Sequence, residues 1–190
     1  MLGVTILKTQ HVGNKEAKKL LPYIQSSDVF SLEIVGCTEA MASRYEEGWA
    51  KILSSSASRS SFLAGIESMA RISCPIESYR QYIVKGFDYM FRNGVPLYHA
   101  ERWEDPEQAK ATGHLQELGE FAFDRGIQLI SEGKEDEGIS LCYQGVSSQY
   151  VSRKARDENI VNNLSRAEST IRNTYLKLRE KDPIQLYIQL

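Results

Sequence analysis

Two residues of this chain stand where an α/β protein would carry out chemistry: a histidine and a glutamate on two expected strands. The segment 3–11 is short, apolar and rich in β-branched residues, and it stops on His11. The segment 28–35 has the same character and carries Glu33. Ligands of open α/β sheets bind outside the carboxyl ends of the strands, so both side chains are candidates for a functional site.

An imidazole beside a carboxylate can move protons or bind a divalent metal ion. A carboxylate among Val, Phe, Leu and Ile is costly unless it is paired or lies in a cleft, and such burial can tune it for proton transfer. Because His and carboxylate ligands suit Mn, Fe or Zn, His11 and Glu33 are also candidate ligands of a divalent metal. Two alternatives stay open: His11 as a hydrogen-bonded structural residue, and Glu33 as a side chain facing water.

A third expected strand, at 95–100, leads into two further candidates. Glu101 and Arg102 follow it directly, so we expect them to emerge at the same edge as His11 and Glu33. The alternative is a solvated loop that holds a local ion pair. His99 is expected to point into the sheet or a covering helix, and we do not assign it to the site.

A polar helix face supplies the remaining candidates. Arg156, Asn159 and Asn163 follow one another at helical spacing, and Asp157 lies next to them. The rigid fork of an Arg side chain suits a carboxylate partner, so Arg156 and Asp157 join the predicted catalytic residues. An ordinary solvated helix face would have the same pattern.

The elements that must position these residues indicate an α/β fold. A helix from Asn14 to about Ile24 separates the first two strands with the spacing of a βαβ unit, which predicts parallel strands. Helical periodicity fills most of 38–93 and 105–180. The predicted breaks in these helices are the serine-rich stretch 54–58, Cys74 with Pro75, and Gly133. An apolar stripe at helical spacing is formed by Ile160, Leu164, Ala167 and Ile171. We therefore expect a mostly parallel sheet of about four strands, with helices on both faces and a large helical portion. The expected strands are 3–11, 28–35, 95–100 and 184–190.

The length of 190 residues suits one α/β domain, 1–190, with helical insertions at about 38–93 and 105–180. The last expected strand ends on Leu190 with no turn behind it. Either this strand lies at an edge of the sheet or the chain is a fragment of a longer protein, and we favour the fragment.

Charge and cysteine content exclude several classes of protein. The formal net charge of -2 gives no reason to expect nucleic acid as a partner, and no apolar stretch is long enough for a membrane span. Cys37, Cys74 and Cys142 are odd in number and widely spaced, which argues against a disulfide framework and predicts a cytoplasmic protein. The common nucleotide, zincin, serine-hydrolase and calcium motifs do not occur.

Taken in order, these pieces resemble the superfamily that joins TraB proteins, Tiki proteases, ChaN haem-binding lipoproteins and erythromycin esterases. Its members have a strand ending in G-x-x-H, a strand with a glutamate, an acidic–Arg pair, an R-D-x-x-M-type element and a second G-x-x-H. The corresponding residues are 8–11, Glu33, Glu101 with Arg102, and 156–160. The chain differs from this pattern at Lys8 and Ile160, where the family has Gly and Met, and it ends before the second histidine.

The resemblance implies a hydrolase-type domain that acts on a small molecule or a peptide, with a divalent metal as a candidate cofactor. His11 would be a base or metal ligand, Glu33 a second base or ligand, and Arg156 would stabilise developing negative charge. The alternatives are a non-catalytic binding or assembly module on the same scaffold, such as a homo-oligomer, and a haem- or small-ligand-binding protein. The resemblance alone suggests haem.

Overall fold

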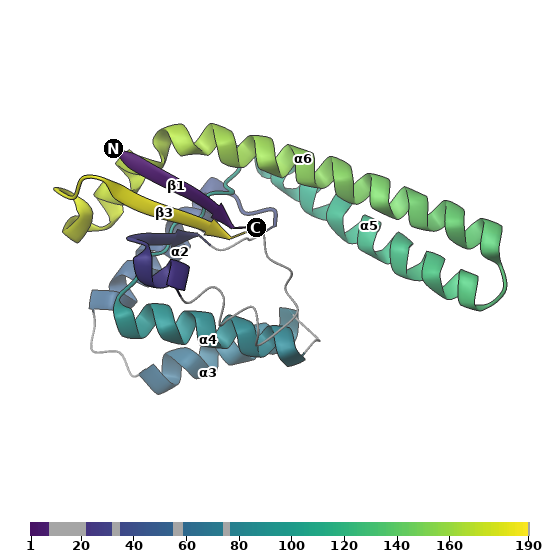
Figure 1. Cartoon of the computed structure of the whole chain (residues 1–190), viewed down its shortest axis with the longest axis horizontal. Coiled ribbons are helices and arrows are strands. Elements are labelled where there is room, and N and C mark those ends of the chain that lie inside the picture. Colours follow the sequence, from purple (N-terminus) through teal and green to yellow (C-terminus); the bar gives the residue numbers. More distant parts are fainter. Residues whose placement is uncertain (8–21, 32–34, 55–58, 74–76, 190) are drawn as a thin grey trace. The chain divides into compact units, whose positions relative to one another are not determined.

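A computed structural model describes residues 1–7, 22–31, 35–54, 59–73 and 77–189 (Figure 1). The fold is mixed α/β and mostly helical, as predicted, and its sheet is parallel. The chain divides into two compact units, which are described separately. Unit 1 comprises 1–33, 42–100 and 166–190, and unit 2 comprises 34–41 and 101–165.

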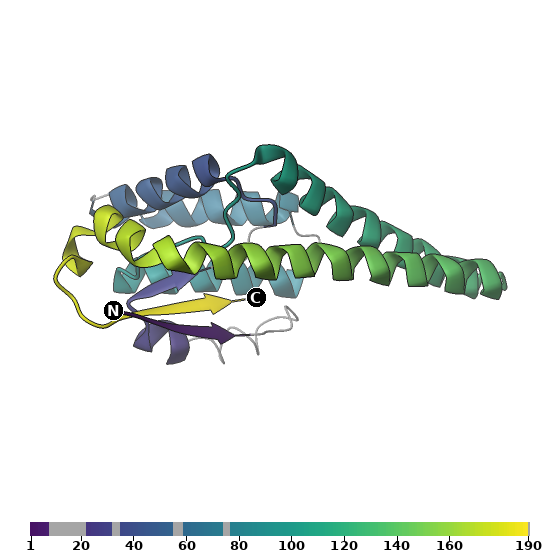
Figure 2. The same ribbon diagram turned by 90° about the horizontal axis from the view of Figure 1, so that it is seen from above.

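The sheet of unit 1 brings the two ends of the chain together. Its strands are β1 (Leu2–Leu7), β2 (Val29–Ser31) and β3 (Ile184–Gln189), in the order β1-β3-β2. Figure 2 shows β3 running in the same direction as β1 beside it. Alternate residues of β3 are buried, namely Ile184, Leu186 and Ile188. In the order β1-β3-β2, the last strand along the sequence is the central strand of the sheet.

The predicted strand at 95–100 is the one that the structure corrects, so the described residues form three strands rather than about four. The segment meets β2 only through an isolated parallel bridge between Phe30 and Leu97. Pro96 has no N–H to donate, which interrupts a ladder. The N–H and carbonyl of Leu97 both bind the Tyr175 hydroxyl, at 3.0 and 2.5 Å. A side chain from a distant part of unit 1 thus replaces a strand partner.

Helices α2 (Glu39–Ser54), α3 (Arg59–Ser73) and α4 (Glu77–Asn93) follow β2. α2 ends at the predicted serine-rich break, and α3 ends just before Cys74 and Pro75, the second predicted break. Trp49 of α2 is buried and lies 5.3 Å from the Phe62 ring and 5.8 Å from the Phe87 ring, measured between centroids. Its indole N–H donates to the Val95 carbonyl at 2.8 Å. Aromatic burial is therefore the main packing of these helices.

Unit 2 consists mainly of an antiparallel pair of long helices, α5 (Pro106–Ser131) and the first three quarters of α6 (Glu135–Thr174), which run side by side in Figures 1 and 2. Asp105 caps α5 by accepting from the N–H of Glu107 at 2.9 Å. The helices join at Gly133, whose φ of +82° favours glycine and confirms the predicted break. No helix in the described ranges is long and apolar enough to cross a membrane.

Four glycines allow α5 and α6 to approach closely. A Cβ on Gly126 would lie 2.7 Å from the Gly138 carbonyl, and a Cβ on Gly145 would lie 2.6 Å from the Gly119 carbonyl. Any side chain at these positions would push the helices apart. The contact between the two helices is therefore made largely of backbone, and it leaves larger side chains on the flanks.

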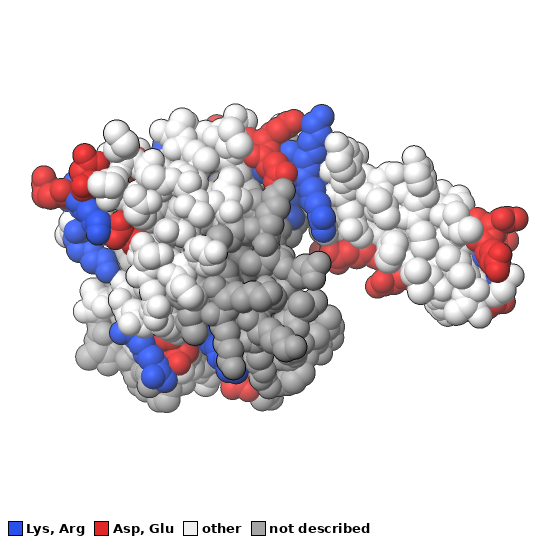
Figure 3. All heavy atoms as spheres, viewed as in Figure 1, with Lys and Arg blue, Asp and Glu red and all other residues white. Residues whose placement is uncertain are grey.

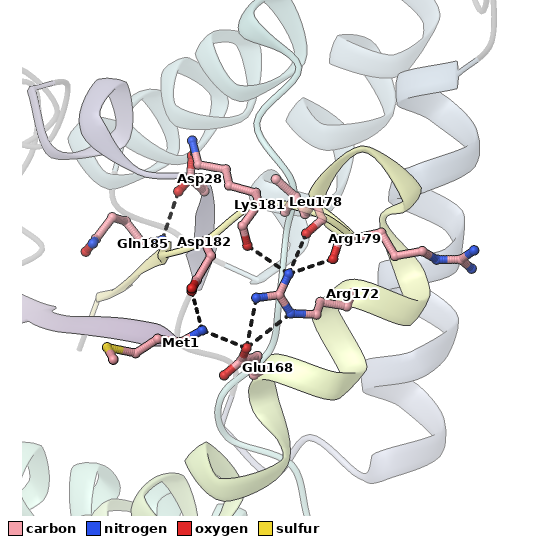
Figure 4. A network of polar contacts seen from close by, with 9 residues as sticks. All are labelled: Met1, Asp28, Glu168, Arg172, Leu178, Arg179, Lys181, Asp182 and Gln185. Atoms are coloured by element: carbon pink, nitrogen blue, oxygen red, sulfur yellow. Dashed lines mark hydrogen bonds and ion pairs between the residues drawn. The ribbon is translucent and has the colours of Figure 1, made fainter.

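A polar network closes unit 1 where α6 leads into β3 (Figure 4). The Arg172 guanidinium donates to three carbonyls beyond the helix end, those of Leu178, Arg179 and Lys181. It also binds Glu168, at 2.8 Å from Nη2. Glu168 accepts in addition from the Met1 ammonium group at 3.0 Å. Hydrogen bonds from this ammonium group and from Arg172 lower the pKa of Glu168.

Candidate functional site

The predicted site residues divide into those that the structure describes and those that it does not. His11 and Glu33 lie outside the described residues. Glu101, Arg156 and Asp157 all belong to unit 2. The described part of the candidate site is the region of unit 2 that surrounds Glu101.

Glu101 and Arg156 form a buried ion pair, in which Arg156 Nε lies 2.8 Å from Glu101 Oε2. Their side chains are only 3% and 6% exposed. Glu101 comes at the start of a short connection to α5, and Arg156 lies on α6, 55 residues later. The structure thus joins two residues that the sequence predicted separately for one site.

The second oxygen of Glu101 is also occupied. Oε1 accepts from the backbone N–H of Gly36 at 3.0 Å and from the indole N–H of Trp103 at 3.1 Å. Gly36 has a φ of +70°, and a Cβ there would lie 3.0 Å from the Ala109 carbonyl, so this position requires glycine. Both oxygens of this carboxylate are therefore already engaged by protein donors. Its geometry fits a residue that orients Arg156.

A second polar group holds Arg102 beside this pair. The backbone N–H of Arg102 donates to Asn159 Oδ1 at 3.0 Å, and its carbonyl accepts from Asn163 Nδ2 at 2.8 Å. The guanidinium of Arg102 binds Glu39 Oε1 at 2.9 Å. These bonds confirm that Arg156, Asn159 and Asn163 share a helix face, and they show that this face binds residues 101–102 directly.

Asp157 does not belong to this buried cluster. Its side chain is exposed, whereas that of Arg156 is buried. Consecutive positions of a helix lie 100° apart, so a face that turns Arg156 inward turns its neighbour toward water. Sequence proximity to Arg156 was therefore not a sufficient reason to place Asp157 in the same cluster.

Unit 1 holds a buried carboxylate and histidine that sequence reasoning left out of the site. Glu46 Oε1 accepts from the backbone N–H of His99 at 2.6 Å, and His99 Nδ1 lies 3.6 Å from the same oxygen. Both side chains are 2% exposed. The position of Glu46 between the buried Ala42 and Trp49, on one face of α2, was the signal that could have identified it.

Tyr175 completes the polar interior of unit 1. Its hydroxyl binds the backbone of Leu97, and burial raises the pKa of this hydroxyl above its ordinary range. Ser31 of β2 accepts from the N–H of Ala100 at 3.0 Å. These side chains hold the irregular segment 95–100 together with two backbone bonds to β2, from the Phe30 N–H to the Pro96 carbonyl and from the Tyr98 N–H to the Phe30 carbonyl.

The described side chains offer no set of metal ligands. Across those ranges, no three His, Cys, Asp or Glu residues converge so as to hold a metal ion. His11 and Glu33, the expected ligands of a divalent metal, lie outside these ranges.

Comparison of the chain with models of protein families, with curated proteins and with solved structures finds no match. The resemblance to the TraB, Tiki, ChaN and erythromycin-esterase superfamily thus stays a prediction from short motifs.

Proposed function

We propose that this chain is a hydrolase-type domain in which Arg156, oriented by Glu101, binds negative charge on a small-molecule or peptide substrate. The observation that carries the proposal is the buried ion pair of Glu101 and Arg156, with both carboxylate oxygens bonded. An oriented guanidinium is suited to bind a substrate carboxylate or the oxyanion that forms at an attacked carbonyl.

The energetics of the pair support a functional role. Removing two charges from water costs several kcal/mol per ion, and replacing a buried pair by apolar residues is often neutral or stabilising. Unit 2 nevertheless buries this pair together with Arg102 and Asn163. Because stability alone does not call for such a cluster, the buried charges favour a role in binding.

The proposed reaction is hydrolysis of an ester or amide. Water adds to the carbonyl carbon, His11 takes the proton from water and later returns it to the leaving group, and Glu33 acts as a second base. In the alternative, His11 and Glu33 would hold a divalent metal, which would supply the activation of water in place of the His11 base.

The test is a hydrolysis assay on the full chain with p-nitrophenyl esters and a peptide mixture, with and without Mn²⁺, Co²⁺ or Zn²⁺. We expect His11→Ala to reduce kcat/KM by about 100-fold or more, the contribution of a general base. His114→Ala is the matched control, because His114 is an exposed histidine on α5.

Arg156→Lys keeps the positive charge but loses the fork of donors, so we expect it to weaken hydrolysis, whereas the exposed Arg153→Lys should not. Absence of hydrolysis under all of these conditions, or equal activity of His11→Ala and His114→Ala, would reject the proposal.

A non-catalytic assembly module is the second candidate, and a separate observation favours it. Unit 2 exposes large apolar side chains along both α5 and α6, such as Phe121 and Tyr143. Exposed apolar surface of this extent is typical of an interaction surface. The hydrolysis assay above distinguishes the two candidates, because an assembly module would hydrolyse none of these substrates whether or not the chain associates.

A further inference from the structure

We propose that two copies of this chain associate through α6, as an antiparallel pair with a two-fold axis between Gln144 and Gly145. This inference does not depend on the hydrolase proposal. It follows from an exposed apolar stripe, from the distribution of charge around the stripe, and from the area that the stripe offers.

The stripe consists of Ile139, Tyr143, Val146 and Tyr150, which are 52–76% exposed. Their spacing of four, three and four residues places them on one face of α6. No residue from Gly138 to Ser152 is charged. The view in Figure 3 shows the middle of the hairpin as largely uncharged and its tip as acidic.

Helix α5 does not cover this stripe. It packs against Gly138 and Gly145, and each of these glycines precedes a stripe residue by one position. One position is 100° of rotation, so the stripe lies beside the intramolecular contact rather than within it. The close approach of backbones at the glycines leaves the large side chains of α6 available to another surface.

The order of residues along α6 makes the stripe complementary to itself when reversed. About a midpoint between residues 144 and 145, Ile139 lies opposite Tyr150, and Tyr143 lies opposite Val146. Each aromatic residue therefore meets an aliphatic one. A surface of this kind forms an isologous interface, in which the same patch serves both copies.

Charge complementarity selects the antiparallel arrangement. The exposed acidic residues Glu135 and Asp136 precede the stripe, and the exposed basic residues Arg153 and Lys154 follow it. Reversal about the same midpoint brings the acidic end of one copy to the basic end of the other. A parallel pair would instead bring like charges together, which is unfavourable.

The exposed area matches what a stable dimer requires. On the helical wheel, with the register set by Gly126 against Gly138, three α5 residues lie on the same side as the stripe: Phe123, Ile127 and Ile130. With the stripe they expose roughly 700 Å², given ~150–250 Å² for a fully exposed large side chain. A standard interface takes ~800 Å² from each partner, and the largest patch on most monomers is ~300–600 Å².

The first test is sedimentation equilibrium or light scattering on the full chain from about 1 to 100 μM, a range that covers typical homodimers. We expect a mass of twice 21.5 kDa at the upper end. Tyr143→Asp should raise the dissociation constant at least about 30-fold, because it removes an aromatic anchor at the centre of the interface.

Phe121→Asp is the matched control, since Phe121 is similarly exposed but lies on the opposite side of the hairpin. It should leave the dissociation constant unchanged. Circular dichroism checks that both variants stay folded. A monomer at about 100 μM, or equal effects of the two variants, would overturn the proposal.

The second test concerns the direction of the two helices. Arg153→Asp alone should weaken the dimer, because it places an acidic residue opposite the acidic end of the partner copy. Adding Asp136→Arg should restore the affinity if the helices are antiparallel. If the double variant is no tighter than Arg153→Asp, the antiparallel register is wrong.

Discussion

The two units of this protein place their apolar side chains in opposite ways. Among the described residues, the buried apolar side chains of unit 2 are few: Cys37, Trp103, Ala109, Leu129 and Ile160. The other buried apolar side chains belong to unit 1. Unit 2 instead exposes Phe, Tyr, Ile, Leu and Val side chains along α5 and α6.

The two units differ in what fills their interiors. Unit 1 depends on aromatic and aliphatic burial around Trp49 and β3. Unit 2 instead has close backbone contacts at glycines between its helices, and its interior also holds the buried polar cluster around Glu101. A unit with little apolar burial and much exposed apolar surface can gain stability by association, as proposed for α6.

The largest effect is expected in the core of unit 1. Trp49→Ala should lower the free energy of unfolding by about 4 kcal/mol, because it removes a buried ring and leaves a cavity. Phe121→Ala in unit 2 removes an exposed ring and should change stability by less than about 0.5 kcal/mol. Urea unfolding measures the free energy of unfolding of both variants. A similar decrease in the two variants would contradict the contrast between the units.

The next effect is expected at the polar cluster of unit 2. Glu101→Gln leaves the Arg156 charge buried without its carboxylate and should cost about 3 kcal/mol. Glu158→Gln, at an exposed position of the same helix, is the control. The apolar double variant Glu101→Leu/Arg156→Met should recover stability in urea unfolding. If the double variant is as unstable as Glu101→Gln, the ion pair of Glu101 and Arg156 itself stabilises the fold.

A smaller effect should separate two glycines of the same helix. A Cβ at Gly113 would have no atom within 4 Å. Gly113→Ala should therefore stabilise the protein by up to about 1 kcal/mol, because alanine has the higher helix propensity. Gly126→Ala would place its Cβ 2.5 Å from Cys142 Sγ and should destabilise by about 1–3 kcal/mol. Thermal unfolding gives the sign of each change, and two stabilising results would refute close packing in unit 2.

The smallest effect is expected at the exposed network of Figure 4. The folded pKa of Glu168 is lowered from 4.5, so its contribution is present above that value and is lost as the pH falls through the folded pKa. Stability of the wild type should therefore fall more steeply below pH 4.5 than that of Glu168→Gln. Glu180→Gln, an exposed control, should follow the wild-type profile.

Several elements could be predicted because their signals are local. The serine-rich break and the Cys74–Pro75 break correspond to the ends of α2 and α3, and Gly133 separates α5 from α6. Of the predicted apolar stripe, Ile160, Ala167 and Ile171 are buried on α6, and Leu164 is half-buried. The strand at 95–100 is not confirmed, because Pro96 has no N–H to donate and the segment meets β2 only through the bridge between Phe30 and Leu97.

The candidate site was predictable in part for the same reason. Helical spacing placed Arg156, Asn159 and Asn163 on one face, and the structure confirms it. Glu46 was missed because a glutamate in a helix is usually exposed, although its spacing from Ala42 and Trp49 placed it on the buried face of α2. Asp157 was included because sequence adjacency does not reveal the direction of a side chain.

The sequence by itself determined the helix boundaries, the parallel direction of the strands and the two polar segments around Glu101 and Arg156. Caps, breaks and periodicity act within a few residues, so they can be recognised without the fold. Only the tertiary structure placed β3 between β1 and β2, joined Glu101 to Arg156, and left the α6 stripe exposed. The strand order and the ion pair each join residues that are far apart in the sequence. The exposure of the stripe depends on where the other described segments pack.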